Sequence, residues 1–99
     1  MNTFSPSDIN LKENIVVIPN AIDKVNAISG YTFTWKADTE NFGGQEDVGV
    51  IAQEVEALGL VGITTTRPDG VKAVRYDRLV PVLIEAIKEL DARVKSLGG

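Results

Sequence analysis

The C-terminal segment of the chain reads DRLVPVLIEAIKELDARVKSLGG, residues 77–99. Its apolar residues recur at spacings of three, four, three, four and three, which is the a/d pattern of a helix that packs along one seam. Asp77 can cap the start of this helix, and the two glycines at 98 and 99 can end it. Pro81 falls in the first turn, where proline costs at most one early hydrogen bond. The seam consists of Val80, Leu83, Ile87, Leu90, Val94 and Leu97.

This seam has two interpretations. The helix can pack on the rest of its own domain, or it can pack against copies of itself. The seam covers fewer than three heptads, and β-branched residues at a with leucine at d favour two strands in isolated coiled coils. The pattern therefore predicts a self-associating helix and leaves the number of chains open.

Short strands are predicted upstream of this helix. Residues 61–66 and 71–76 flank Arg67-Pro68-Asp69-Gly70, and proline followed by Asp-Gly indicates the turn of a β-hairpin. Residues 31–35 read YTFTW, an alternation that predicts a strand with its aromatic side chains on one face. The β-branched run at 15–18 predicts a short buried strand.

Small helices are predicted between these strands. Asn20 can cap a helix that Gly30 ends. Residues 48–58 have apolar side chains near the helical period, and the polar stretch 36–47 between strand and helix predicts an exposed loop. The predicted fold class is α+β: short strands, a β-hairpin and small helices, ending in a long C-terminal helix.

Composition excludes several classes of function. The chain has 99 residues, a net charge of −4, no cysteine and no histidine. This length fits one domain with a modest core, for which oligomerisation would help. The negative charge argues against a nucleic-acid or anionic-membrane partner, and no apolar stretch is long enough to span a bilayer. Disulfides, Cys/His zinc sites and histidine bases are excluded, so we expect no cofactor.

The polar loop at 36–47 raises two further possibilities that its spacing does not favour. Its acidic residues do not follow the alternating ligand pattern of a calcium loop, and no lysine follows the glycine pair at 43–44 as in a phosphate-binding loop. We therefore expect a solvated loop and no metal site. The acidic residues are Asp38, Glu40, Glu46 and Asp47.

Four ordered blocks resemble one known family. They are SDINLKENI at 7–15, YTFTWK at 31–36, GVIAQEV at 49–55, and the helix from Tyr76 that contains LIEAIKEL at 83–90. Together they look like the C-terminal intramolecular chaperone auto-processing domain of phage endosialidases, tailspikes and L-shaped tail fibres. The resemblance runs from residue 7 almost to the end, so we expect an upstream arm at 1–6 and the chaperone domain at 7–99.

The resemblance implies an assembly function. Members of the family are homotrimers, so the a/d seam is expected to be a trimer interface in a helical bundle. They bring three chains into register and assist folding of the upstream fibre. They are then released by self-cleavage. The partners implied are two copies of the same chain and the upstream fibre segment, in the host cytoplasm during virion assembly.

The resemblance also implies a catalytic pair. By motif position the serine–lysine dyad falls on Ser7 and Lys12, and the cleaved bond is Pro6–Ser7, with Asp8 and Asn10 as secondary residues near the cut. A lysine can serve as base for a serine only after its ammonium loses a proton, which burial favours. Residues five apart do not share a face of a strand or a helix. The pair therefore needs a turn between its members, or a lysine from a neighbouring chain.

Two alternatives stay open. The chain could be a non-cleaving trimerisation or capping module of a fibre, since the family usually has arginine where this chain has Asn10. The family also usually has a Pro-Glu step where this chain runs Leu58-Gly59-Leu60-Val61-Gly62, which indicates a loop variant. The same domain occurs in a membrane-tethered transcription factor of animals, but no membrane segment or basic DNA-binding region is present here.

Overall fold

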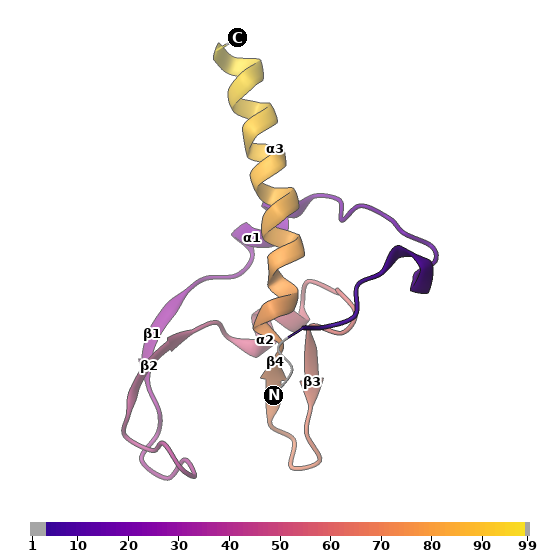
Figure 1. Cartoon of the computed structure of the whole chain (residues 1–99). Helices are drawn as coiled ribbons and strands as arrows, with labels where there is room; N and C mark the ends of the chain where they lie inside the picture. The colour runs from indigo at the N-terminus through magenta and orange to yellow at the C-terminus, as the bar shows by residue number, and fades with distance from the viewer. Residues whose placement is uncertain (1–3, 99) are drawn as a thin grey trace.

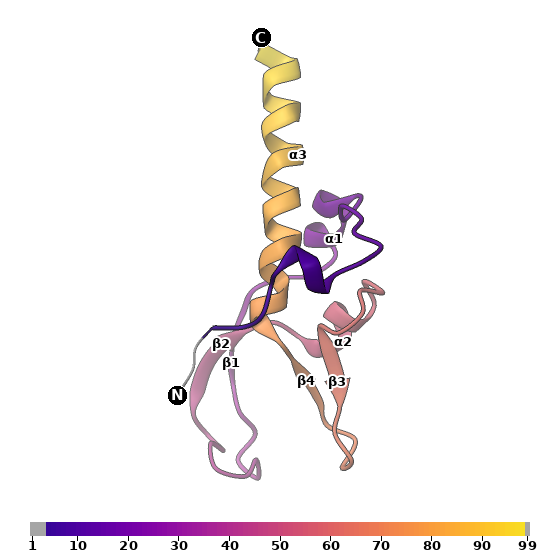
Figure 2. The same ribbon diagram turned by 45° about the vertical axis from the view of Figure 1, so that its right-hand side comes forward.

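A computed structural model describes residues 4–98. One long helix rises from the base of two small hairpins, and a short helix lies beside its middle (Figure 1). The N-terminal arm runs from that short helix out across the space beside the long helix (Figures 1 and 2). The elements in chain order are η1 (Ile9–Leu11), α1 (Ala21–Asn26), β1 (Tyr31–Thr34), β2 (Glu46–Gly49), α2 (Ala52–Glu56), β3 (Thr64–Thr66), β4 (Lys72–Val74), η2 (Tyr76–Leu79) and α3 (Val80–Gly98).

The strands form two separate antiparallel pairs. β1 pairs with β2, with Tyr31 opposite Gly49, and β3 pairs with β4, with Thr64 opposite Val74. The turn of the second pair places Gly70 at φ +88°, a left-handed conformation that glycine adopts without steric cost. The predicted hairpin and the predicted strand at 31–35 are both confirmed.

The boundary between loop and helix around residue 48 differs from the prediction. Residues 46–49 form β2 instead of the end of a loop and the start of a helix, and α2 begins only at Ala52. The reason is tertiary, because the backbone of this segment pairs with β1. A hydroxyl also accepts a bond just after β2: Val50 N donates to Tyr76 Oη at 3.1 Å.

The core is small and lies where α2, the β3–β4 hairpin and the base of α3 meet. Val55, Ile63, Leu79 and Val82 form one buried cluster. Half-buried apolar side chains surround the cluster, and they come from the α1 region, the segment between β2 and α2, the loop before β3, and strand β4. They are Ile18, Val25, Ile28, Val50, Leu60 and Val74.

The start of the long helix is tighter than predicted. Asp77 lies inside η2 and does not cap α3, so the predicted cap is wrong. The 3₁₀ turn leads directly into α3 at Val80, and Pro81 does occupy the first turn of α3. The predicted long C-terminal helix is confirmed, and the fold class is α+β.

The predicted strand at 15–18 is wrong. This segment has no regular secondary structure, and Ile15, Val16 and Val17 are 65–80% exposed. A strand is stable only where another strand or a packed face satisfies it, and the segment pairs with neither β1 nor β3. Residues 15–17 instead form an exposed link between the first ordered turn of the arm and the α1 region, whereas Ile18 is half-buried against the core.

Candidate active site

The first ordered turn of the arm is a 3₁₀ helix that its own sequence stabilises. The Asp8 carboxylate accepts a hydrogen bond from Asn10 N at 2.9 Å, and the backbone bonds Leu11 N to Asp8 O and Lys12 N to Ile9 O follow at 3.1 Å each. A short acidic side chain before a turn is a favoured N-cap. This cap fixes the path of the chain between residues 7 and 12.

The turn brings Ser7 and Lys12 together within one chain. Lys12 Nζ donates a hydrogen bond to Ser7 Oγ at 2.9 Å. The sequence left two routes to such a contact, a turn or a neighbouring chain, and here the turn supplies it. Three residues per turn in η1 shorten the distance that an extended arm would impose.

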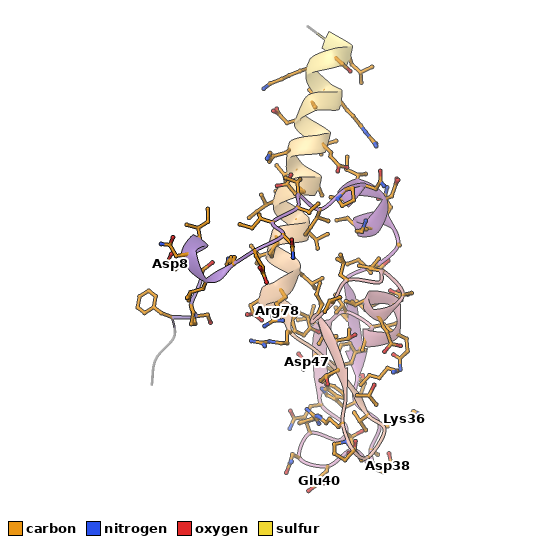
Figure 3. The ribbon with its side chains drawn as sticks, turned by 90° about the vertical axis from the view of Figure 1, so that its right-hand side faces the viewer. Asp8, Lys36, Asp38, Glu40, Asp47 and Arg78 are labelled. Atoms are coloured by element: carbon orange, nitrogen blue, oxygen red, sulfur yellow. The ribbon has the colours of Figure 1, made fainter. Side chains whose placement is uncertain are left out.

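The pair lies on the surface. Residues 4–17 are all exposed, and Asp8 sits on a part of the arm that projects away from the long helix (Figure 3). Apolar neighbours, Ile9 and Leu11, are exposed on the same turn. Apolar residues are therefore close to Lys12 in the sequence, but their side chains are not packed around it in the single chain.

Two of the predicted secondary residues, Asp8 and Asn10, contact each other. Asp8 organises the turn through its cap, and the backbone of Asn10 is what it binds. Pro6 precedes the serine on exposed chain. Residues 1–3 of the predicted upstream arm lie outside the described residues, as does Gly99.

The start of α1, where the arm ends, is bonded to a residue that the sequence analysis did not single out. Glu89, in the middle of α3, accepts hydrogen bonds from Ala21 N at 2.8 Å and from Ile22 N at 3.0 Å. Asn20, the predicted cap of this helix, adopts a left-handed conformation and makes no side-chain cap bond. Asn20 therefore occupies the predicted N-cap position without a cap bond from its side chain, and the carboxylate of Glu89, 68 positions after Ala21, supplies the acceptor instead. No local pattern could have found this contact.

The same contacts favour the ionised form of Glu89. The N–H groups of Ile22 and Ala21 hold the pKa of this carboxyl below its ordinary value, and nearby Arg93 and Lys24 lower the pKa further. The ionised form is the one that accepts two bonds at the positive end of a helix. Lys24 Nζ also donates a hydrogen bond to Pro19 O at 2.6 Å. The segment just before α1 is therefore bonded to α1, as the start of α1 is bonded to α3.

The predicted interface residues form an exposed stripe on α3. All six seam side chains are 45% to 87% exposed. A different stripe faces the domain: Leu79, Val82 and Ala86 are buried, and Val82 is only 1% exposed. The interpretation that the seam packs on its own domain is therefore not what the single chain shows.

The acidic loop lies far from the arm. Asp38 and Glu40 lie at the tip of the β1–β2 hairpin at the bottom of the view, whereas Asp8 lies out to the side at about the mid-height of the molecule (Figure 3). Trp35 Nε1 donates to Asp47 at 3.2 Å, so Asp47 has a structural partner in this hairpin. Among residues 4–98, no three acidic side chains converge as they would around a metal ion.

No helix within the described residues is long and apolar enough to cross a membrane.

Comparison with known proteins gives a family and a context. Residues 7–61 match the model of a peptidase family described as chaperone of endosialidase. The chain is 34% identical over 93 residues to long tail fiber protein Gp37 of Escherichia phage AR1, covering 89% of this chain and 8% of that protein. It is 31% identical over 102 residues to the same protein of Enterobacteria phage T2, covering 97% and 7%.

The family match covers more than half of the chain and starts at Ser7. The chain belongs to the chaperone of endosialidase family. It spans less than a tenth of the length of these two tail fibre proteins.

Proposed function

We propose that this chain is a trimerising intramolecular chaperone of a phage tail fibre, which assists folding of the upstream fibre and then releases itself by cutting the Pro6–Ser7 bond. Membership of the chaperone of endosialidase family and the likeness to long tail fiber proteins support the chaperone role. The observation that carries the cleavage step is the 2.9 Å contact between Lys12 Nζ and Ser7 Oγ. In this proposal the chain is a serine-type autopeptidase that acts once, in the host cytoplasm during virion assembly.

The chemistry starts from the position of the serine. Ser7 follows the bond to be cut, so its Oγ attacks the carbonyl carbon of Pro6 while the neutral Lys12 amine accepts the hydroxyl proton. The bond between the Pro6 carbonyl carbon and Ser7 N then breaks, and that nitrogen takes the proton from Lys12. Water hydrolyses the resulting ester, which restores the serine hydroxyl and leaves a carboxylate on Pro6.

The exposed dyad of a single chain lacks one requirement for this chemistry. A lysine is a base only as the neutral amine, and removal from water favours that form. The side chains of Ile9 and Leu11 beside the dyad are apolar and exposed, so a partner surface that packs on them would bury apolar area. In the proposed assembly, a neighbouring chain or the upstream fibre buries this turn, and cutting follows docking.

The trimer itself is supported by α3. Six seam residues present an apolar stripe to solvent along the length of the helix, and apolar patches of this kind mark interfaces. We propose that three copies of α3 bury this stripe in a parallel bundle. Once the chaperone is released, an unfolded fibre could not readily refold. The lifetime of the assembled fibre would then depend on the height of its unfolding barrier.

The test is self-cleavage of the domain expressed behind its natural fibre segment. We expect the wild-type chain to yield a fragment whose mass and first residue correspond to a cut before Ser7. Ser7→Ala and Lys12→Ala should stay intact on a denaturing gel. A wild-type chain that remains whole after folding contradicts autoproteolysis.

Matched controls separate the dyad from its neighbourhood. Ser5→Ala removes a hydroxyl on the other side of Pro6, and Lys36→Ala removes an exposed lysine at the end of the β1 region. Both variants should cut at the wild-type rate. Loss of cutting in either control would point to a folding defect or a different nucleophile.

The non-cleaving module is the second candidate, and two observations favour it. The dyad is exposed, and Asn10 stands where the family usually has arginine. Under this alternative, Ser7 and Lys12 are ordinary surface residues and the seam alone carries the function. The cleavage test above decides between the two, and Asn10→Arg shows whether the missing arginine is the reason for any lost activity.

A further inference from the structure

The junction between the arm and the long helix offers a role that the dyad chemistry does not use. α1 is the first α-helix after the arm in the chain, and its first two N–H groups donate hydrogen bonds to the carboxylate of Glu89 on α3. Ala21, the first residue of α1, is fully buried. The arm that bears Ser7 and Lys12 is thus fixed to the molecule at a point on α3.

Glu89 lies on a face of α3 that leaves the seam free. With Ile87 at an a position and Leu90 at d, Glu89 falls at c. The c position shares a stripe with Val82 and Ala86, both of which face the domain. At about 100° per residue, this stripe is centred roughly 110° from the seam, so three seams can meet while each Glu89 still holds its own α1.

The arm between this junction and the dyad has little structure of its own. Residues 12–20 form no helix or strand, and residues 12–17 are exposed. Such a link restricts where the dyad can lie only if its α1 end is fixed. Each residue that is free to move adds conformational entropy, which docking of the dyad must remove. A loose α1 would enlarge the volume that the dyad explores.

We propose that Glu89 is a positioning residue for self-cleavage: by capping α1 from α3, it sets where the Ser7–Lys12 turn meets its docking surface in the assembly. The inference rests on the proposed autoproteolysis for its consequence. The contact on which it depends is the pair of hydrogen bonds from Ala21 N and Ile22 N to Glu89, here called the clasp between α1 and α3. The clasp can be measured in a chain that does not cleave. Lys24 on α1 and Arg93 on α3 are the charged groups that face this carboxylate.

The test uses the full chain behind its natural fibre segment. Glu89→Ala should slow first-order cleavage about tenfold. Glu89→Gln keeps one acceptor oxygen, so the conservative change should restore most of the rate and leave a two- to threefold defect. Glu85→Gln is the matched control, because it removes a carboxylate whose partner is Lys88 on the same helix. That control should cut at the wild-type rate.

Hydrogen exchange distinguishes the clasp from the chemistry. In an uncut Ser7→Ala background, mass spectrometry of the peptide that contains α1 should show faster exchange in Glu89→Ala, while peptides from β3 and β4 remain protected. Unchanged exchange of α1 would overturn the clasp. Wild-type cleavage speed in Glu89→Ala would overturn the positioning role. A wild-type chain that never cuts rejects autoproteolysis and with it the positioning role, while the exchange result still decides the clasp.

Discussion

At the scale of the residue, two contacts decide how the arm is arranged. Ser7 and Lys12 meet because one turn of 3₁₀ helix, capped by Asp8, lies between them. Glu89 reaches α1 from α3 and supplies the acceptor that Asn20 does not. The first contact is local and its residues could be read from a motif, whereas the second joins positions that only the fold brings together.

The ionisation of Glu89 gives a prediction for pH. Its pKa is lowered chiefly by the N–H groups of Ile22 and Ala21. A carboxyl with a lower pKa in the folded state stabilises the fold above its unfolded pKa, and this contribution is lost as pH falls through the folded value. Wild type should therefore unfold at a higher temperature than Glu89→Gln at pH 7, at equal protein concentration. The difference in unfolding temperature should shrink as the pH is lowered below the ordinary pKa range of glutamate. A difference that does not change with pH would contradict this role of the Glu89 carboxylate.

Gly62 gives a second prediction at this scale. It adopts φ +83°, and an added Cβ would collide with the Arg78 guanidinium, whose Nη1 donates to Gly62 O at 3.1 Å. Arg78 lies at the base of α3 (Figure 3). Gly62→Ala should lower the free energy of unfolding by about 1–2 kcal/mol. Gly30→Ala, where φ is not positive and space is open, should change it by less than about 0.5 kcal/mol; equal effects in a denaturant titration would refute the assignment.

At the scale of the element, α3 carries two apolar stripes with different uses. One stripe, through Val82 and Ala86, packs on the domain, and the other, through Leu83, Ile87 and Leu90, is exposed. A helix of a monomer buries one stripe and leaves the remainder polar. The second stripe is explained if copies of α3 associate, which is the state that the proposed function requires.

Ile87→Asp tests this use of the seam. A charge in the middle of a buried seam would be left without a partner, a change that typically costs several kcal/mol. We expect the variant to sediment as a monomer and the wild type as a trimer. Ala92→Asp adds the same charge at an exposed f position of the same helix and should remain trimeric. An Ile87→Asp chain that still forms trimers would contradict the seam as the interface.

The elements that the sequence predicted well are those whose signal is local. The turn at Pro68-Asp69-Gly70, the aromatic alternation of β1 and the periodicity of α3 each follow from neighbouring residues. Residues 15–18 have the composition of a strand but no partner, and residues 46–49 became a strand because β1 pairs with them. The dyad residues were found through family resemblance, and their contact required the fold of the arm.

At the scale of the whole molecule, the single chain is extended and thinly packed. Its radius of gyration is 16.9 Å and its extents are 53 × 37 × 26 Å, whereas a compact domain of this length has a radius near about 13 Å. Only a few side chains among the described residues are fully buried, and apolar residues of the arm and the seam face solvent. A chain of this shape has most to gain from burying those surfaces in an assembly.

Stability that depends on protein concentration is the consequence. If three folded chains associate and unfolded chains do not, mass action stabilises each folded chain by roughly 2 kcal/mol for a hundredfold rise in concentration. For a domain of this size, that corresponds to a rise in the thermal midpoint on the order of 10 °C. We expect wild type to show this rise in circular dichroism melts across that range. Ile87→Asp should melt lower and at a midpoint that does not depend on concentration, because its unfolding is unimolecular. A wild-type midpoint that stays constant would mean that the chain is a monomer with an exposed seam and arm. This result would contradict the proposed trimer.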